Sequence, residues 1–304
     1  MPLDNHLVAG TLAGLISTVG LYPLELLKMR MQVTDGVSSA YTSMRSAVRS
    51  VLQDEGFWGL YKGMTPGVIA STGSWGGYFY FYELSKRRKL SSKQAAGGGN
   101  NSSTLGVSDH MLSGVEAGSI MQLIFNPLWL IKTRLAIQDA QGLFSDVSRV
   151  NSLPKYRGMT DAFVTILAEE GVRGLYKGLL PGLLLTSHGA VQFASYEFMK
   201  AEVHKILSTQ DGEQPAWVSI ALGGISKVIA STVTYPYQVL KSRLQQRGNL
   251  TDYRYHGLID CAMQTARSEG IRGFFRGLLP AVARVAPASA LTFVVYEETL
   301  KLLK

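Results

Sequence analysis

The sequence predicts an all-α membrane protein with six transmembrane helices in three pseudo-symmetric repeats, joined by short surface helices. Three observations predict this class: the composition, an internal repeat, and two long apolar stretches in each repeat unit. Hydrophobic residues make up 46% of the 304 residues and charged residues only 17%. Because a soluble protein usually carries about 25% charged residues, the composition favours a membrane protein.

A proline-headed basic motif recurs at intervals of about 105 residues. It reads PLELLKMRMQ from Pro23, PLWLIKTRLA from Pro127 and PYQVLKSRLQ from Pro236. One such motif is usually only a helix end with a solvated charge pair. Three copies in register are not chance, and a repeat of this length sets the architecture of the whole chain.

Two further motifs recur in the same order after each basic motif. The first reads EGFWGLYKG, EGVRGLYKG and EGIRGFFRG, from Glu55, Glu170 and Glu269. The second reads YELSK, YEFMK and YEETL, from Tyr82, Tyr196 and Tyr296. The ordered recurrence of three motifs predicts three copies of one structural unit.

Each unit is expected to hold a long helix, a short surface helix and a second long helix. The first spanning helices are expected near 7–22, 111–126 and 217–235, continuing into the basic motifs. The second spanning helices are expected near 64–82, 179–198 and 278–298. Amphipathic surface helices are expected near 43–54, 159–169 and 258–268.

We place the repeats at residues 1–90, 107–207 and 208–304. Residues 91–106 are rich in Gly, Ser and Asn and are expected to form a flexible linker. Residues 139–155 are expected to form a longer loop in the second unit only. The apolar segment 7–22 is interpreted as the first spanning helix and not as a cleavable targeting segment.

Several functional classes find no support in the composition. The net charge is +8, but the basic residues are scattered, so nucleic-acid binding is not expected. The single cysteine, Cys261, excludes an internal disulfide, and the five histidines are dispersed. We therefore expect no metal site, no catalytic group and no bound cofactor.

The three motifs together resemble the signature of the mitochondrial carrier family, and the resemblance covers the whole chain. It implies threefold pseudo-symmetry around a central substrate site in the inner mitochondrial membrane. It also implies multi-pass topology with short matrix helices and with both termini towards the intermembrane space. Alternating access would use one charge ring on the matrix side and another on the cytoplasmic side.

The resemblance also implies the residues of the two gates. Family members carry an acid two residues after each motif proline, but here only Glu25 does so. Glu25 should then meet Lys132 of the next repeat. The matrix gate is expected at Glu25, Lys28, Trp129, Lys132, Gln238 and Lys241. The cytoplasmic gate is expected at Glu83, Lys86, Glu197, Lys200 and Glu297.

Local similarity indicates the branch of carriers for FAD and folate. A tryptophan in the second basic motif resembles carriers of FAD, folate, NAD and pyrimidine nucleotides. More specific similarity to the FAD and folate members lies in the segments at 74–83, 177–197, 226–245 and 283–297. NAD or pyrimidine nucleotide transport is the alternative. A non-transporting scaffold or a membrane-embedded enzyme has less support in the sequence.

The substrate site is expected at mid-depth in the membrane. Arg284 occupies the family's contact position on the sixth helix and is interpreted as a lone cation that binds an anion. Equivalent positions on the second and fourth helices are Ala70, Ser71, Leu184 and Leu185. The expected site further includes Lys227, Glu116, Trp75, His188 and Gln192.

Some of these residues have a second interpretation. Glu116 and Lys227 could line the site or pair with each other across the bundle. Trp75, His188 and Gln192 could contact a heteroaromatic ring or only pack. Trp129 could stack on the substrate or form an apolar plug beneath it.

Two groups of glycines are expected to bind lipid or to let helices pack closely. The resemblance implies cardiolipin binding at Gly63, Gly178 and Gly277, where exposed N–H groups begin the even-numbered helices. Gly10 with Gly14, and Gly114 with Gly118, are interpreted as positions where helices pack closely.

Overall fold

The structure is a computed structural model that describes residues 3–33, 43–95, 105–139, 154–207, 216–247 and 255–302. Every element in these ranges is helical. In chain order they are α1 (Leu3–Val33), α2 (Met44–Asp54), η2 (Phe57–Tyr61), α3 (Met64–Ala95), α4 (Val107–Ile137), α6 (Met159–Leu175), α7 (Leu179–Leu184), η4 (Leu185–Ser187), α8 (His188–Leu207), α9 (Ala216–Leu244), α10 (Leu258–Glu269), η5 (Gly270–Phe275), α11 (Leu278–Ala283) and α12 (Val285–Leu302).

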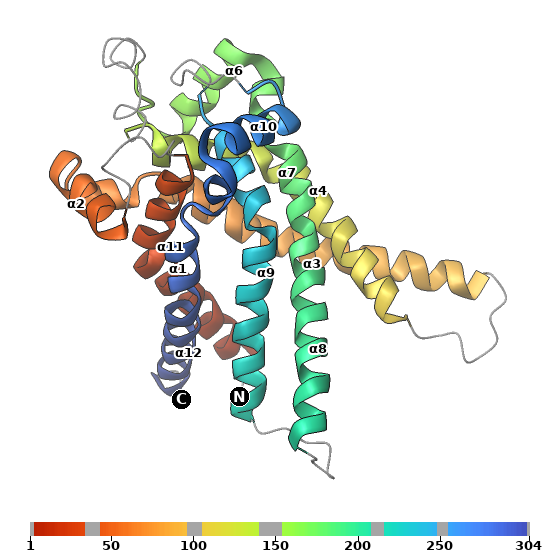
Figure 1. Ribbon diagram of the computed structural model, residues 1–304. Coiled ribbons are helices and arrows are strands. Elements are labelled where there is room, and N and C mark those ends of the chain that lie inside the picture. The colour runs from red at the N-terminus through yellow and green to blue at the C-terminus, as the bar shows by residue number, and fades with distance from the viewer. Residues whose placement is uncertain are drawn as a thin grey trace.

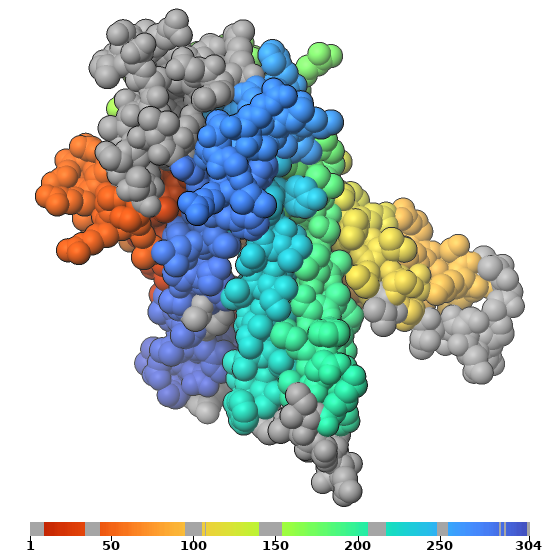
Figure 2. Space-filling view, viewed as in Figure 1, coloured from red at the N-terminus to blue at the C-terminus, as the bar shows by residue number. Residues whose placement is uncertain are grey.

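The long helices associate as three pairs: α1 with α12, α3 with α4, and α8 with α9. The pairs meet at the end of the molecule that carries α6 and α10, and they diverge towards the other end (Figure 1). The α3 and α4 pair extends furthest from the rest of the body (Figure 2). The molecule is therefore closed at one end and open at the other.

The expected surface helices are present as α2, α6 and α10. The amphipathic helix in the second unit ends at a break at Gly171, whose φ of 67° is non-helical. Apolar side chains of α2 and α6 pack against the C-terminal halves of α1 and α4, which follow the motif prolines. The buried core thus lies at the closed end.

Among the described residues, two helices, Ala9–Val33 and Trp217–Leu244, are both long and apolar enough to cross a membrane. The helices α3 and α4 are also long, with 32 and 31 residues, but they do not meet the same criterion of length and composition. Six membrane-spanning helices therefore remain part of the functional proposal below.

The linker prediction needs one correction. The helix α3 continues to Ala95, so residues 91–95 are helical. The remaining linker residues up to 104, and most of the loop expected at 139–155, lie outside the described residues.

Candidate functional site

Three buried ion pairs hold the closed end together. The arginine of each basic motif binds the glutamate of the EG motif in the same unit. The pairs are Arg30 with Glu55, Arg134 with Glu170 at 2.6 Å, and Arg243 with Glu269 at 2.6 Å. All three arginines are fully buried, so the pairing offsets a large desolvation penalty.

Each of these arginines also binds the next unit. Its Nε donates to a backbone carbonyl oxygen at the C-terminal end of a neighbouring long helix. The acceptors are Ala136 for Arg30 (2.9 Å), Gln245 for Arg134 (3.0 Å) and Gln32 for Arg243 (3.2 Å). The three contacts form a closed cycle that fixes α1, α4 and α9 relative to one another.

Sequence reasoning missed these pairs, although a signal was present. The glutamate of the EG motif and the arginine of the basic motif recur together in every unit. An acid and a base that recur together in a protein with few charges are expected to pair, because unpaired charges in a core are expensive.

The motif lysines form a layer next to the arginines, facing the open end. Lys132 Nζ lies 2.5 Å from Oε1 of Glu25, which is the contact expected from the resemblance. Lys28 Nζ donates to Oε1 of Gln238 at 2.6 Å. An amide thus accepts from Lys28 where the family would supply a carboxylate.

The indole ring of Trp129 faces the ammonium groups of Lys132 and Lys241. The centre of its ring is 4.9 Å from Lys132 Nζ and 6.0 Å from Lys241 Nζ. The negative face of an indole ring stabilises a nearby ammonium group. Trp129 therefore compensates part of the charge that the missing acid of the second motif leaves unbalanced.

The expectation that Arg284 is a lone cation is wrong. Arg284 Nη1 donates to Oε2 of Glu25 at 3.0 Å. Because Lys132 binds Oε1 of the same carboxylate, Glu25 lies between two cations. Sequence reasoning could not find this contact, which joins residues 259 positions apart.

A cationic cavity of about 450 Å³ lies at the lysine layer. Its charged lining residues are Glu25, Lys28, Lys132, Lys227, Lys241 and Arg284. Five bases against one acid give a net formal charge of +4 among the described lining residues. Such a cavity attracts an anion that carries more than one negative charge.

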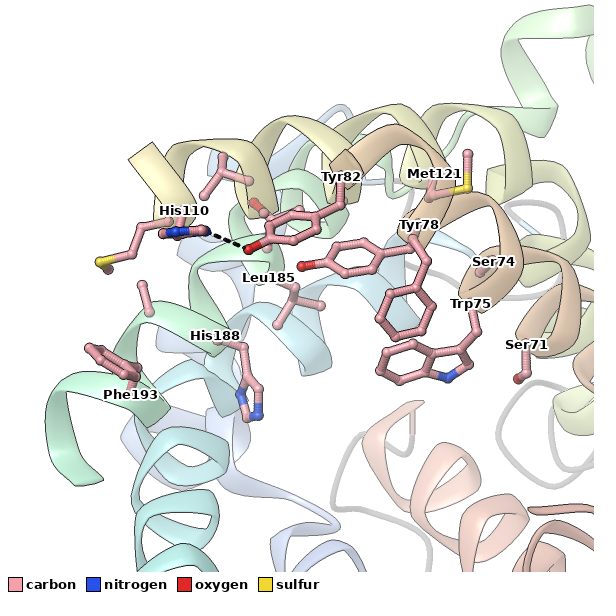
Figure 3. Close-up of a pocket in the computed structure, with 18 of the residues that line it drawn as sticks. Ser71, Ser74, Trp75, Tyr78, Tyr82, His110, Met121, Leu185, His188 and Phe193 are labelled. Atoms are coloured by element: carbon pink, nitrogen blue, oxygen red, sulfur yellow. Dashed lines mark hydrogen bonds between the residues drawn. The ribbon is translucent and has the colours of Figure 1, made fainter. Parts of the chain in front are cut away.

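A larger cavity of about 950 Å³ adjoins it and is mainly aromatic and apolar. Its walls come from α3, α4, η4 and α8, with Trp75, Tyr78 and Tyr82 on one side and His188 and Phe193 on the other (Figure 3). Trp129, Leu185 and His188 line both cavities. The two cavities therefore form one site with an aromatic part and a cationic part.

The model for the mitochondrial carrier protein family matches residues 1–93, 103–206 and 212–304. The chain belongs to the mitochondrial carrier family. Proteins of this family are transporters, and this carrier is a transporter of that type.

Relatives of this carrier are named as transporters of folate or of nicotinamide adenine dinucleotide. It is 40% identical to folate transporter 1, chloroplastic, of Arabidopsis thaliana, over 99% of this chain and 96% of that protein. It is 35% identical to nicotinamide adenine dinucleotide transporter 2, mitochondrial, of the same plant, over 96% and 78% of the two chains. It is 32% identical to mitochondrial nicotinamide adenine dinucleotide transporter 1 of Saccharomyces cerevisiae, over 95% and 74%.

The carrier's two cavities bring together most of the residues expected to bind substrate. Ser71 and Trp75 line the aromatic cavity, and Lys227 and Arg284 line the cationic cavity. Leu185 and His188 belong to both. Ala70, Leu184 and Gln192 line neither of these two cavities.

The hypothesis that Glu116 pairs with Lys227 is wrong. Glu116 accepts a hydrogen bond from Ser85 Oγ at 2.7 Å and forms an ion pair with Arg88. Both partners lie in α3, so Glu116 joins α4 to α3. It lines neither cavity, and its position supports a structural role.

The open end of the carrier holds the residues expected to form the cytoplasmic gate. Glu83 pairs with Lys86 of the same helix at 2.8 Å, and the Glu83 side chain is exposed. The helix α3, which carries Glu83 and Lys86, diverges from α8 and α12 at this end (Figure 1). The role of the five residues as a gate remains a prediction.

The glycines expected to bind cardiolipin make close contacts with the closed end. Gly63, Gly178 and Gly277 have φ values of 81°, 76° and 77°, which L side chains rarely adopt. A Cβ atom on Gly63 would lie 2.7 Å from the carbonyl oxygen of Lys132, and one on Gly277 would lie 2.9 Å from that of Lys28. These glycines let each unit approach the lysine layer, and cardiolipin binding stays a prediction.

The close-packing hypothesis holds for one of the two glycine pairs. A Cβ atom on Gly114 would lie 3.1 Å from the Tyr78 hydroxyl oxygen, and one on Gly118 would lie 3.4 Å from Thr186. Among the described residues, nothing lies within 4 Å of a Cβ atom on Gly10 or Gly14, so the structure does not support the hypothesis for these two.

Proposed function

We propose that this carrier moves FAD or a folate across the inner mitochondrial membrane, through six transmembrane helices arranged as three repeats. The observation that carries the proposal is the cationic cavity, which is lined by five bases and one carboxylate, beside an aromatic cavity. FAD and the folates combine planar heteroaromatic rings with two or more negative charges. Arginine binds such anions through parallel N–H donors, and aromatic side chains stack on such rings.

The proposed mechanism is alternating access. A substrate anion that reaches Arg284 competes with Glu25 for the same guanidinium group. Loss of that contact, together with attraction of Lys132 to the substrate, weakens the ion pair at the closed end. The matrix gate then opens while Glu83, Glu197 and Glu297 approach Lys86 and Lys200 to close the other end.

The proposal includes an orientation and a lipid partner. Both termini face the intermembrane space, and α2, α6 and α10 lie on the matrix side. Backbone N–H groups after Gly63, Gly178 and Gly277 begin helices and favour the phosphates of cardiolipin. Because some relatives are named chloroplastic, imaging of a fluorescent fusion against mitochondrial and plastid markers tests the location.

NAD or a pyrimidine nucleotide is the second candidate substrate. The relatives named as NAD transporters, at 32–35% identity, favour the NAD part of this alternative. A scaffold without transport activity is less well supported, because the motif lysines and Glu25 are retained and in contact with partners.

Uptake into liposomes tests the proposal directly. Purified carrier would be reconstituted with cardiolipin and offered radiolabelled FAD, FMN, folate, NAD and pyrimidine nucleotides in separate assays. We expect saturable uptake of FAD or folate that vanishes in Arg284→Ala protein. Uptake of NAD or a pyrimidine nucleotide alone would favour the second candidate, and uptake of none would contradict both.

A further inference from the structure

Four aromatic side chains of α3 form one continuous surface in the wall of the aromatic cavity. Trp75 and Phe79 stack with ring centres 6.0 Å apart, and Tyr78 and Tyr82 stack at 6.0 Å with their planes within 11° of parallel. Residues four positions apart lie on the same side of a helix, so the two stacks run side by side. We call these four residues the aromatic ladder.

Glycines on α3 let α4 pack closely against the helix that carries the ladder. A Cβ atom on Gly73 would lie 2.5 Å from the Phe125 ring, and one on Gly77 would lie 2.4 Å from the sulfur of Met121. The helix α4 therefore packs closely against this side of α3. Trp75 and Phe79 remain 64% and 59% exposed while lining the cavity, which leaves their ring faces open to a ligand.

The ladder is separated from the charges of the site. Among the described residues that line the aromatic cavity, none is Lys, Arg, Asp or Glu. All the charged lining residues lie in the cationic cavity, beyond Trp129, Leu185 and His188. The ladder is thus separate from the cluster formed by the motif lysines, Glu25 and Arg284.

The depth of each part follows from the rise of α3. A Cβ atom on Gly67 would lie 3.2 Å from Nζ of Lys132, so Gly67 marks the level of the lysine layer. At about 1.5 Å per residue, Trp75 lies about 12 Å and Tyr82 about 22 Å further along the axis, towards the open end. The motif lysines and Arg284, which binds the same carboxylate as Lys132, are therefore deep, and the ladder is nearer the opening. Lys227 is the exception, because it lies 14 residues before Lys241 on α9, about 21 Å towards the open end at the same rise.

From this separation we infer that the transported molecule has its planar ring at one end and its anionic groups at the other. The anionic end binds in the cationic cavity, and the ring stacks on the aromatic ladder. A folate, with a pterin ring at one end and glutamate carboxylates at the other, has this arrangement, and so does FMN. FAD and NAD carry their phosphates between two ring systems and would have to place a second ring beyond the cations.

The inference rests on the proposed function and narrows its substrate class. Ligand binding to the purified full-length carrier tests it through the rise in melting temperature and the concentration for half-maximal effect. We expect folate or FMN to be effective at concentrations at least about tenfold below those of FAD and NAD. The difference corresponds to the loss of one ring stack on the ladder, because FAD and NAD have to place a second ring beyond the cations. Equal or better binding of FAD or NAD would overturn the inference.

Substitutions at Trp75 test the ladder itself. Trp75→Ala should weaken folate binding by about tenfold, and Trp75→Phe should retain most of it because a stacking ring remains. Trp58→Ala is the matched control, since Trp58 is 79% exposed and lines neither cavity. The melting temperature without ligand should change little in all three variants.

The outcomes separate the two proposals. Uptake of folate with unchanged affinity by Trp75→Ala protein would contradict the stacking of the substrate ring on the ladder. The transport proposal would not be affected by that result. If the wild-type carrier neither binds nor takes up any compound in the panel, the proposed function fails, and this inference fails with it.

Discussion

Arg284 donates a hydrogen bond to Oε2 of Glu25 at 3.0 Å, joining the turn between α11 and α12 to α1. The other oxygen of this carboxylate lies 2.5 Å from Nζ of Lys132. One carboxylate thus connects a residue expected to bind substrate with a residue expected to close the matrix side. This arrangement gives substrate binding a direct route to the gate.

Glu25→Gln should strongly impair transport. Glu25 is the single acid among the described lining residues of the cationic cavity, and an amide leaves Lys132 and Arg284 without a compensating charge. Removing one partner of a buried ion pair typically costs about 3–5 kcal/mol. We expect a lower melting temperature and at least a tenfold loss of uptake in liposomes, about the effect of 1.4 kcal/mol on a rate.

Glu202→Gln is the matched control for this substitution. Glu202 is an exposed acid that pairs with Lys205 of the same helix. Its substitution should leave both uptake and melting temperature unchanged. A stable Glu25→Gln carrier with full activity would show that the ion pair at the closed end is not a gate.

Arg284→Ala and Arg284→Lys should differ in a way that reveals the role of the guanidinium group. The alanine variant should lose uptake, while the lysine variant should recover part of it. An ammonium keeps the charge but loses the planar two-point donor geometry. In both variants the added substrate should raise the melting temperature less than it does in wild type.

A purely structural role for Arg284 predicts another pattern. Both variants would then lose stability without ligand, while substrate would still raise the melting temperature of the folded fraction as in wild type. Lys227, which also lines the cationic cavity, would be the next residue to test.

Much of the fold could be predicted because its signals are local and repeated. The three surface helices follow from amphipathic patterns, and the contact between Glu25 and Lys132 follows from the family's neighbour-to-neighbour pairing. The lysine layer was also expected, because charges in an apolar helix must face one another or water. The sequence shows that Gln238 replaces the acid of the third motif. It does not show that Gln238 accepts a hydrogen bond from Lys28.

The remaining features depend on contacts that no local pattern encodes. Arg284 looked unpaired because its partner lies at the other end of the sequence. Glu116 looked like a site residue because its partners, Ser85 and Arg88, face it only once α3 and α4 are packed. The glycines Gly10 and Gly14 have the spacing of a packing motif, but spacing alone does not bring a second helix near them.

Gly63→Ala should destabilise the carrier. The φ of 81° is unfavourable for an L residue by about 1–2 kcal/mol. The new methyl group would also meet the backbone oxygen of Lys132 at 2.7 Å. We expect a lower melting temperature in detergent and reduced uptake, because the contact lies beside the lysine layer.

Gly14→Ala provides the matched control within a helix. In the part of the chain that the structure describes, nothing lies within 4 Å of the added methyl group, and alanine is favoured over glycine in a helix by about 1 kcal/mol. Its melting temperature should be unchanged or higher. A Gly63→Ala carrier as stable as Gly14→Ala would contradict the close approach of the first unit to α4.

Glu170→Gln should destabilise the closed end in a pH-dependent way. The substitution leaves Arg134 buried without its carboxylate partner, at a cost of about 3–5 kcal/mol. Burial alone would raise the pKa of Glu170, but hydrogen bonds and attraction from Arg134 and Lys177 outweigh it and hold this pKa below the usual 4.5. Since the folded-state pKa is lowered, the stabilisation is complete above about pH 4.5 and is lost as the pH falls through the folded-state pKa.

Melting temperatures of wild type and Glu170→Gln, measured from pH 7 down to the limit of solubility, test this prediction. The gap between the two proteins should be widest at neutral pH and should narrow as the pH falls below about 4.5, because protonation removes the charge of Glu170 in wild type as well. Lys177→Gln is the control on the same carboxylate. Lys177 is 41% exposed, so its loss should cost less than about 1 kcal/mol. A gap that stays constant with pH would mean that Glu170 stabilises the fold through packing and not through its charge.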